Sequence, residues 1–283
     1  MTAGLIHSYD GVLFDLDGVL YAGPSAIDGA AEAVEELVRL EVPRAYVTNN
    51  ASRSAQQVAE HLQSLGIPAL TEEVFGSAPA GIILLTESVA PGASVLVTGS
   101  DYLRELVEQA GFVVVRSSVQ TPDAVIQGFD PSLSWADLAE ASYAINAGAQ
   151  WFATNLDLSI PRERGIAPGN GALIEAVGRA TGQRPRAAGK PEPVMFTQAA
   201  QYLQLTNPLV VGDRLDTDVL GGNRAGFDTT LVLTGIDSEA AAAQAEPESQ
   251  PRWIIEHLGA LFDGAHRPVR TAEHPAPQQG PST

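Results

Sequence analysis

The chain has 283 residues, of which 45% are hydrophobic, and this length and composition suit two globular domains better than one. With 34 acidic against 16 basic residues its formal charge is -18, which argues against nucleic acid and anionic membranes as partners. The sequence contains no cysteine, and this excludes disulfides, thiolate nucleophiles and cysteine-ligated zinc.

The amino terminus lacks the basic segment that opens a signal peptide, and no run of about 18 apolar residues occurs along the chain. We therefore expect a cytoplasmic protein without membrane contact. Because the overall charge is strongly negative, an anionic ligand would need locally placed cations and backbone N–H donors to bind.

The amino-terminal part of the chain alternates between strand and helix patterns. Residues 11–15, apolar up to Phe14, are typical of a short buried strand, and residues 27–40 carry apolar side chains at helical spacing after the candidate cap Asp28. The pattern repeats with a strand at residues 44–48 and a helix at residues 54–65, which begins at a serine and ends before a glycine.

A second series of strands and helices fills the middle of the chain and is long enough to form its own domain. The sequence predicts strands at residues 94–98, 124–127 and 151–154, and helices at residues 101–110, 135–147 and 171–181.

The carboxyl-terminal part returns to the first pattern. It predicts strands at residues 208–211, 229–233 and 253–255 and a helix from about residue 217 to residue 225. Together with the amino-terminal strands these favour an α/β fold whose parallel sheet is covered by helices on both faces.

Two carboxyl-terminal segments are less regular. Residues 238–245 are rich in alanine and fit either a helix or a solvated connection. Residues 264–283 are rich in proline and polar side chains and lack hydrophobic periodicity, so we expect them to form a disordered tail.

Asp15, Asp17 and Gly18 follow the first predicted strand. Ligand sites of parallel sheets lie at the carboxyl ends of the strands. If the chain turns at Asp17, the two carboxylates can take different positions around one substrate, which suits a nucleophile and a general acid. Taken alone, an acidic turn is the plainer explanation. An EF-hand fits poorly, because the glycine at position 6 and the glutamate at position 12 of its loop are not supplied here.

Residues 47–50, Val-Thr-Asn-Asn, end the next predicted strand. The hydroxyl of Thr48 and free backbone N–H groups at such a strand end can hold the oxygens of a phosphoryl group. A turn followed by a helix cap is the alternative, and Ser52 or Ser54 fits that cap.

Lys190 lies in the segment Gly-Lys-Pro-Glu-Pro, residues 189–193, whose proline predicts the first turn of a helix. A lysine at a helix amino terminus adds its charge to that of the helix dipole and favours an anion. A solvated lysine is the alternative. The segment is not a P-loop, because the spacing fails and Pro191 stands where serine or threonine is needed.

Asp213, Asp216 and Asp218 follow the predicted strand at residues 208–211. Carboxylates this close repel one another unless a hard cation lies among them, and Mg²⁺ binds carboxylates together with water and substrate oxygens. A capped acidic loop is the alternative. It applies most to Asp216, which we expect at the periphery, paired with Arg214.

The four segments together predict a metal. If they meet, the carboxylates of Asp15, Asp17, Asp213 and Asp218 outnumber the single cation of Lys190, so a dianionic phosphate needs a divalent ion in order to bind. The sequence therefore predicts Mg²⁺ as the cofactor.

In order along the chain, these segments resemble the four motifs of the haloacid dehalogenase superfamily of phosphohydrolases. The long interval between the second and third is similar to the α/β cap of the NagD and nitrophenylphosphatase-like branch, as are residues 153–157 and 168–171. The resemblance implies a Rossmann-like doubly wound core of residues 1–78 and 188–263, an inserted C2-type cap of residues 79–187, and hydrolysis of a small phosphate monoester through an aspartyl phosphate.

The resemblance also implies roles for the acidic residues. Asp15 would be the nucleophile and a metal ligand. Asp17 would be the general acid and base, and its backbone carbonyl would also bind the metal. Asp213 would be the side-chain metal ligand, and Asp218 would orient the metal-bound waters or Lys190.

For the substrate, the resemblance implies that the phosphate is bound by Thr48, Asn49 and Lys190. Asn155 and Asp157 are candidate contacts to the remainder of the substrate. Glycerol 3-phosphate is favoured, with phosphoglycolate, pyridoxal phosphate and nucleotide monophosphates as alternatives.

Other functions stay open. A phosphotransferase or mutase also uses an aspartyl phosphate, although Asp17 favours hydrolysis. A receiver-like signalling domain is smaller and needs neither the inserted cap nor an acid at that position. The resemblance further implies a homodimer formed through the cap.

Overall fold

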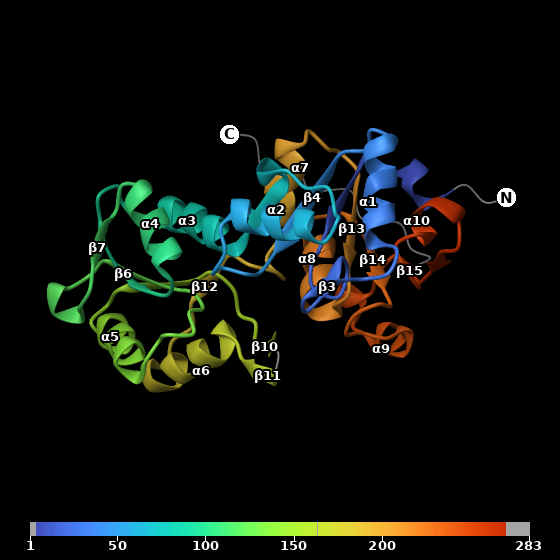
Figure 1. Cartoon of the computed structure of the whole chain (residues 1–283). Coiled ribbons are helices and arrows are strands. Elements are labelled where there is room, and N and C mark those ends of the chain that lie inside the picture. The colour runs from blue at the N-terminus through green and yellow to red at the C-terminus, as the bar shows by residue number, and fades with distance from the viewer. Residues whose placement is uncertain (1–3, 163, 270–283) are drawn as a thin grey trace, which may run out of the picture. The chain divides into compact units, whose positions relative to one another are not determined.

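The computed structural model describes residues 4–162 and 164–269. The chain forms two compact units, one from Met1–Arg44 and Ala200–Thr283 and the other from Ala45–Ala199. Both combine parallel strands with helices (Figure 1). Every helix in the described residues is too short or too polar to cross a membrane.

The first unit is built on a mostly parallel sheet with the strand order β16-β15-β14-β13-β1. Its strands are β1 (Gly11–Phe14), β13 (Pro208–Gly212), β14 (Asp228–Val232), β15 (Trp253–Ile255) and β16 (Arg267–Pro268), of which only β16 pairs antiparallel. Phe14 is paired with Val211, so β1 and β13 end at the same edge of the sheet.

Short helices and turns complete this unit. They are α1 (Ala30–Arg39), α8 (Leu220–Arg224), α9 (Glu239–Gln244), α10 (Ala260–Asp263), the 3₁₀ turns Leu5–Ser8 and Pro247–Ser249, a π-helical turn at Leu215–Val219, and the hairpin of β2 (Tyr21–Ala22) and β3 (Ser25–Ala26). The apolar side chains of the π-helical turn pack with Ala242 of α9, Leu231 of β14 and Ile254 of β15, which buries one face of the sheet.

The second unit begins with the parallel pair of β4 (Arg44–Thr48) and β5 (Val74–Gly76). Between them lie α2 (Ala55–Ser64) and the 3₁₀ turn Thr71–Glu73. Ser54 caps α2: its hydroxyl accepts the N–H of Gln57, whose side chain accepts the N–H of Ser54. The unit ends with α7 (Val194–Tyr202), which continues past Ala199.

A five-stranded parallel sheet of order β12-β9-β8-β6-β7 forms the rest of this unit. Its strands are β6 (Ser94–Thr98), β7 (Val113–Val115), β8 (Ala124–Gln127), β9 (Gln150–Ala153) and β12 (Arg186–Ala187). The other elements are α3 (Ser77–Ser88), α4 (Asp101–Gln109), the 3₁₀ turn Ser118–Gln120, α5 (Trp135–Asn146), the hairpin of β10 (Ser159–Arg162) and β11 (Gly165–Pro168), and α6 (Asn170–Thr181).

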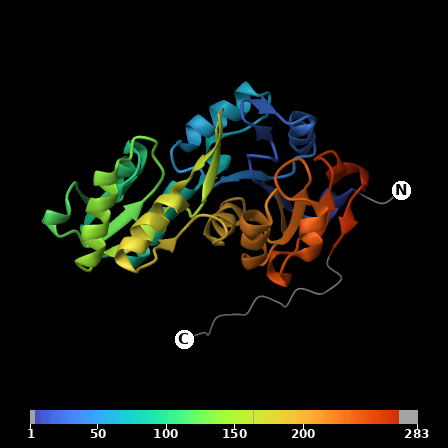
Figure 2. The same cartoon turned by 90° about the horizontal axis from the view of Figure 1, so that it is seen from below.

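Helices cover this sheet on both faces. Figures 1 and 2 show α5 and α6 side by side, and their apolar side chains pack against Leu96 of β6, Val125 of β8 and Trp151 of β9. Helices α3 and α4 lie on the other face (Figure 1). The arrangement confirms the predicted mixed α/β fold with parallel sheets.

The structure confirms several predicted elements and corrects others. The strands predicted at residues 44–48, 94–98, 124–127 and 253–255 have these bounds, and residues 239–244 of the alanine-rich segment are helical. The helix predicted at residues 217–225 is instead a π-helical turn followed by a short α-helix. Strands β5, β7, β10 and β11 and helix α3 were not predicted.

Two predicted helix starts are wrong. Helix α1 is preceded by Gly29, with φ 81°, and not by Asp28. Helix α7 begins at Val194, so Pro191 lies in the turn before the helix and Lys190 is not in its first turn.

The predicted tail begins before the end of the observed fold. Residues 264–269 are part of the fold, because Arg267 and Pro268 pair with β15 at the sheet edge. Residues 270–283 lie outside the described residues. The compact units divide after Arg44 and Ala199. The division into a core of residues 1–78 and 188–263 and a cap of residues 79–187 stays a prediction.

Candidate active site

Three buried carboxylates gather at the end of β1 and β13. Asp15, Asp213 and Asp218 each offer one oxygen, and these oxygens lie within 4.8 Å of one another. Their residues are 8%, 1% and 1% exposed. Asp15 is far from Asp213 and Asp218 in the sequence, and the parallel pairing of β1 with β13 brings their carboxylates together.

The backbone holds Asp15 and Asp213 in place. The N–H of Asp15 donates to the carbonyl of Val211 at 2.9 Å, which continues the strand pairing by one residue. The carboxylate of Asp213 accepts the N–H of Ile236 at 2.9 Å, and its carbonyl accepts the N–H of Asp237 at 3.1 Å. One face of the Asp213 carboxylate is therefore tied to the loop after β14.

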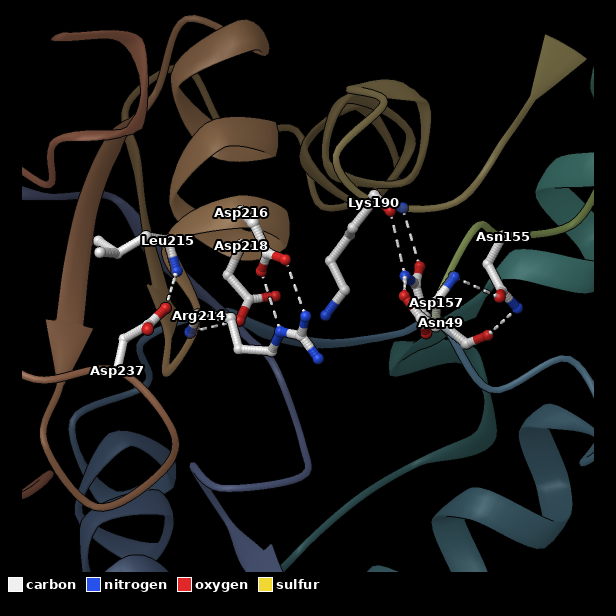
Figure 3. A network of polar contacts seen from close by, with 9 residues as sticks. All are labelled: Asn49, Asn155, Asp157, Lys190, Arg214, Leu215, Asp216, Asp218 and Asp237. Atoms are coloured by element: carbon white, nitrogen blue, oxygen red, sulfur yellow. Dashed lines mark hydrogen bonds and ion pairs between the residues drawn. The ribbon is translucent and has the colours of Figure 1, made fainter. Parts of the chain in front are cut away.

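Asp218 reaches the cluster through the π-helical turn. Its carboxylate accepts the N–H of Arg214 at 3.1 Å, and its own N–H donates to the carbonyl of Arg214 at 3.1 Å (Figure 3). Leu215 donates its N–H to the carboxylate of Asp237 at 2.7 Å. These bonds hold the turn that follows β13 against the loop that follows β14.

Two glycines leave room for the Asp213 carboxylate. A Cβ added to Gly235 would lie 2.0 Å from Asp213 Oδ2, and one added to Gly18 would lie 2.3 Å from the same oxygen. Gly18 also has φ 84°, a conformation that side-chain-bearing residues rarely adopt. Both positions require glycine because the chain passes too close to the carboxylate for any side chain.

Asp17 follows Asp15 by two residues and is exposed. Its Oδ2 accepts a hydrogen bond from the hydroxyl of Tyr21 at 3.3 Å, and the N–H of Gly18 donates to the carbonyl of Tyr21 at 2.8 Å. The chain thus turns directly after Asp17, which meets the condition for the two carboxylates to take different positions. A carboxylate in contact with solvent can exchange protons, which a general acid must do.

The carboxylate cluster suits a hard divalent cation. Two unit negative charges within 4.8 Å repel by at least about 3 kcal/mol at an effective dielectric constant of about 20, so a cation placed among the three carboxylates lowers their mutual repulsion. A set made only of oxygen donors favours Mg²⁺ or Ca²⁺ over zinc or copper. The residues present therefore fit the predicted Mg²⁺.

The second unit contains the predicted phosphate-binding residues. Lys190 is 3% exposed and its Nζ donates to the carbonyl of Val47 at 3.2 Å. The hydroxyl of Thr48 accepts the N–H of Asn50 at 3.1 Å. Both residues are thus held at the loop that follows β4, and a buried ammonium there is the local cation that an anionic ligand requires.

The side-chain amide of Asn49 connects this loop to Lys190 and Asp157. Its Nδ2 donates to Asp157 Oδ1 at 2.8 Å and to the carbonyl of Lys190 at 3.1 Å, and its Oδ1 accepts the N–H of Lys190 at 2.8 Å (Figure 3). Asn155 is 4% exposed and donates to the carbonyl of Asn49 at 2.8 Å. The predicted residues Asn49, Asn155, Asp157 and Lys190 therefore form one hydrogen-bonded group.

Asp216 lies at the periphery, as predicted. Its carboxylate forms a two-point ion pair with Arg214, with distances of 3.0 and 2.8 Å (Figure 3). The Asp216 side chain is 67% exposed. Such surface pairs contribute at most about 1 kcal/mol, and Asp216 is not one of the three clustered carboxylates.

Sequence reasoning missed several residues around these groups. Gly235, Ile236 and Asp237 support Asp213, and Ser77 donates its hydroxyl to the carbonyl of Asn49 at 2.7 Å. No local pattern singles out these residues, because their partners lie far away in the sequence. The strand predicted at residues 229–233 indicates that a loop follows it, but does not indicate that this loop contacts Asp213.

Family models match most of the chain. A model for haloacid dehalogenase-like hydrolases matches residues 12–113, and one for HAD-hydrolase-like proteins matches residues 187–261. The two matches include the carboxylate cluster and Lys190.

Similar proteins point to the same family. The chain is 44% identical over 257 residues to the D-glycerol 3-phosphate phosphatase of Mycobacterium tuberculosis, covering 91% of this chain and 72% of that protein. It is 37% identical over 255 residues to the acid sugar phosphatase of Staphylococcus haemolyticus, covering 89% and 95%.

A solved structure shares the fold over the same range. It is the crystal structure of a glycerol phosphate phosphatase from Mycobacterium tuberculosis in complex with magnesium, which is 43% identical and covers 93% of this chain and 79% of that one, with a TM-score of 0.88. The chain therefore belongs to the haloacid dehalogenase-like hydrolase family.

Proposed function

We propose that the chain is a phosphatase that hydrolyses a small phosphate monoester through an aspartyl-phosphate intermediate and uses Mg²⁺ as its cofactor. The observation that carries the proposal is the cluster of Asp15, Asp213 and Asp218, with Asp17 two residues beyond the nucleophile. Support comes from the phosphatase activity named for both relatives and from the magnesium bound to the related structure.

In the first step a carboxylate oxygen of Asp15 attacks phosphorus, and the bond from phosphorus to the leaving oxygen breaks. Asp17 donates its proton to the departing alkoxide, which leaves as an alcohol. In the second step Asp17 takes a proton from water as the water oxygen attacks the aspartyl phosphate. Inorganic phosphate departs and the Asp15 carboxylate is restored.

The other proposed residues bind the phosphoryl group. Thr48 donates its hydroxyl to a phosphoryl oxygen, and the Lys190 ammonium neutralises part of the oxygen charge. Asp15 and Asp213 would hold Mg²⁺ through their side chains, the backbone carbonyl of Asp17 would be a further ligand, and Asp218 would orient the metal-bound waters or Lys190. When bound, Mg²⁺ offsets the charge that the transferred group carries in the transition state.

Glycerol 3-phosphate is the substrate that we propose first, because the relative with 44% identity is a D-glycerol 3-phosphate phosphatase. Sugar phosphates follow, because a second relative is an acid sugar phosphatase. Phosphoglycolate, pyridoxal phosphate and nucleotide monophosphates remain further candidates.

A panel of phosphate esters tests this proposal. Purified protein with Mg²⁺ is assayed for phosphate release from each ester, and kcat/KM values are compared. We expect glycerol 3-phosphate to rank first. A higher kcat/KM for another ester would replace the substrate and keep the reaction, whereas release from none of the esters would refute the phosphatase itself.

The proposal also includes a cytoplasmic location and a homodimer formed through the cap. Support for the dimer comes from two aromatic side chains of α5 that are largely exposed, Trp135 at 78% and Tyr143 at 55%. Light scattering of the wild type and of Trp135→Ala at matched concentrations measures the mass. A monomeric wild type would refute the dimer.

A further inference from the structure

The main chain of Lys190 is held by the side chain of Asn49. The Asn49 amide accepts the N–H of Lys190 at 2.8 Å and donates to its carbonyl at 3.1 Å, while its second hydrogen is directed to Asp157 at 2.8 Å. An amide side chain has two donor hydrogens, which are the groups that could bind a phosphate anion, and both are used inside the protein. The Asn49 side chain therefore positions the lysine and does not itself contact phosphate.

Asn49 is in turn held by two buried donors. The backbone carbonyl of Asn49 accepts a hydrogen bond from the side-chain amide of Asn155 at 2.8 Å and one from the hydroxyl of Ser77 at 2.7 Å. Asn155 and Ser77 are 4% and 0% exposed. Two donors occupy both lone pairs of one carbonyl oxygen, which fixes the backbone of the loop that follows β4.

The amide nitrogen of Asn155 directs its two donor hydrogens to protein atoms, the carbonyl oxygen of Asn49 and Thr154 Oγ1. Its distance from Thr154 Oγ1 is 3.4 Å, and Asn155 Oδ1 accepts the N–H of Asp157 at 3.2 Å. Asn170, the first residue of α6, donates to the carbonyl of Asn155 at 2.8 Å and to that of Gln127 at 3.3 Å. A series of three amides thus runs from Asn170 through Asn155 and Asn49 to Lys190.

The series depends on a close approach of two chain segments. A Cβ added to Gly189 would lie 2.6 Å from the carbonyl oxygen of Thr154 and 2.7 Å from Asn49 Oδ1. Only glycine allows the backbone before Lys190 to come so near to both. Sequence position 189 therefore serves the contact between Asn49 and Lys190.

We infer that Asn155 and Asn170 are positioning residues that fix Lys190 through Asn49, and that Asn155 does not contact the leaving group. The inference rests on the proposed function insofar as Lys190 binds the phosphoryl group. It replaces the two roles expected from sequence, which placed Asn49 on the phosphate and Asn155 on the rest of the substrate.

The two roles for Asn155 predict different kinetics. A residue that positions Lys190 acts on the phosphoryl group, which all phosphate monoesters share, so its loss should lower kcat/KM by the same factor for every leaving group. It should also weaken competitive inhibition by orthophosphate. A residue that contacts the leaving group should change kcat/KM unequally and leave the inhibition constant of orthophosphate unchanged.

The experiment compares wild type, Asn155→Ala, the near-isosteric Asn155→Leu and the control Asn146→Ala, an exposed asparagine at the end of α5. Aryl phosphate and glycerol 3-phosphate serve as substrates. Both Asn155 variants should lose about 10-fold in kcat/KM on each substrate and raise the inhibition constant of orthophosphate by about 10-fold, as expected for one lost buried hydrogen bond. Asn146→Ala should change neither quantity.

Losses that differ by more than about threefold between the two esters, with unchanged inhibition by orthophosphate, would overturn the inference. An inhibition constant does not depend on the folded fraction, so partial unfolding of a variant cannot imitate the expected result. Asn170→Ala provides a second variant and should show a smaller loss of the same kind.

Failure of the proposed function can be distinguished from failure of the inference. If the wild type hydrolyses no ester, the phosphatase is refuted, and calorimetric binding of orthophosphate to wild type and Asn155→Leu still tests the positioning role. Equal orthophosphate affinity of the two proteins would overturn the inference. A wild type that binds no orthophosphate would overturn both.

Discussion

Asp15 and Asp213 bring carboxylate oxygens to within 4.8 Å of each other, although one follows the first strand of the chain and the other follows β13. The parallel pairing of Phe14 with Val211 is the cause, because it makes both strands end at the same edge of the sheet.

Asp15→Asn should abolish turnover. An amide is a poor nucleophile and cannot form the aspartyl phosphate, so kcat should fall at least about 1,000-fold on an aryl phosphate. The far-ultraviolet circular dichroism spectrum should be unchanged, because the Asp15 N–H still donates to Val211. Activity near that of the wild type would contradict the nucleophilic role.

Activity should require Mg²⁺. With excess chelator, phosphate release should fall to background and return when Mg²⁺ is added in excess of the chelator, since the clustered carboxylates repel a dianionic ester by themselves. Full turnover in chelator would contradict the metal assignment.

Asp213→Asn should stabilise the protein without metal and weaken its binding of Mg²⁺. Removal of one charge relieves repulsion in the cluster by about 3 kcal/mol or more at an effective dielectric constant of about 20, and asparagine can still accept the N–H of Ile236. We expect a higher melting temperature in chelator and a Kd for Mg²⁺ raised at least about 10-fold.

The matched control is Asp216→Asn, which removes the same charge three residues away in an exposed ion pair. Calorimetric Mg²⁺ binding and melting in chelator should stay close to those of the wild type, within about 1 kcal/mol of stability. If the two substitutions weakened Mg²⁺ binding equally, the affinity would depend on the overall charge of the protein and not on the carboxylate cluster.

Gly235→Ala should impair the metal site without touching a ligand. Its Cβ would lie 2.0 Å from Asp213 Oδ2, so the carboxylate or the loop after β14 must shift. We expect a Kd for Mg²⁺ raised at least about 10-fold. Gly81→Ala in α3 is the control, because its Cβ would meet nothing closer than 3.4 Å and alanine favours a helix. Unchanged Mg²⁺ affinity of Gly235→Ala would refute the supporting role of that loop.

Lys190→Met should weaken phosphate binding while keeping the buried volume. The ammonium is the cation proposed for the phosphoryl oxygens, so kcat/KM should fall about 100-fold on both aryl phosphate and glycerol 3-phosphate. Competitive inhibition by orthophosphate should weaken in parallel. An unchanged inhibition constant for orthophosphate would remove Lys190 from the phosphate site.

The sequence by itself determined the alternation of strands and helices and the residue types at the strand ends. Runs such as residues 94–98 and 124–127 were predicted correctly because apolar periodicity and turn residues act locally, within a few positions. The acidic segments after β1 and β13 were also recognisable, since parallel strands place their carboxyl ends at one edge.

Only the tertiary structure decided which partner each polar group has. Asn49 and Asn155 are the same residue type, and both lie in loops after strands. Nothing near them in the sequence shows that the side chain of Asn49 bonds to the backbone of Lys190, or that the side chain of Asn155 bonds to the backbone of Asn49. Hydrogen bonds act over about 3 Å, so their partners depend on which chain segments approach one another, as at Gly189 and Gly235. Long-range packing sets that approach, and local sequence patterns do not contain it.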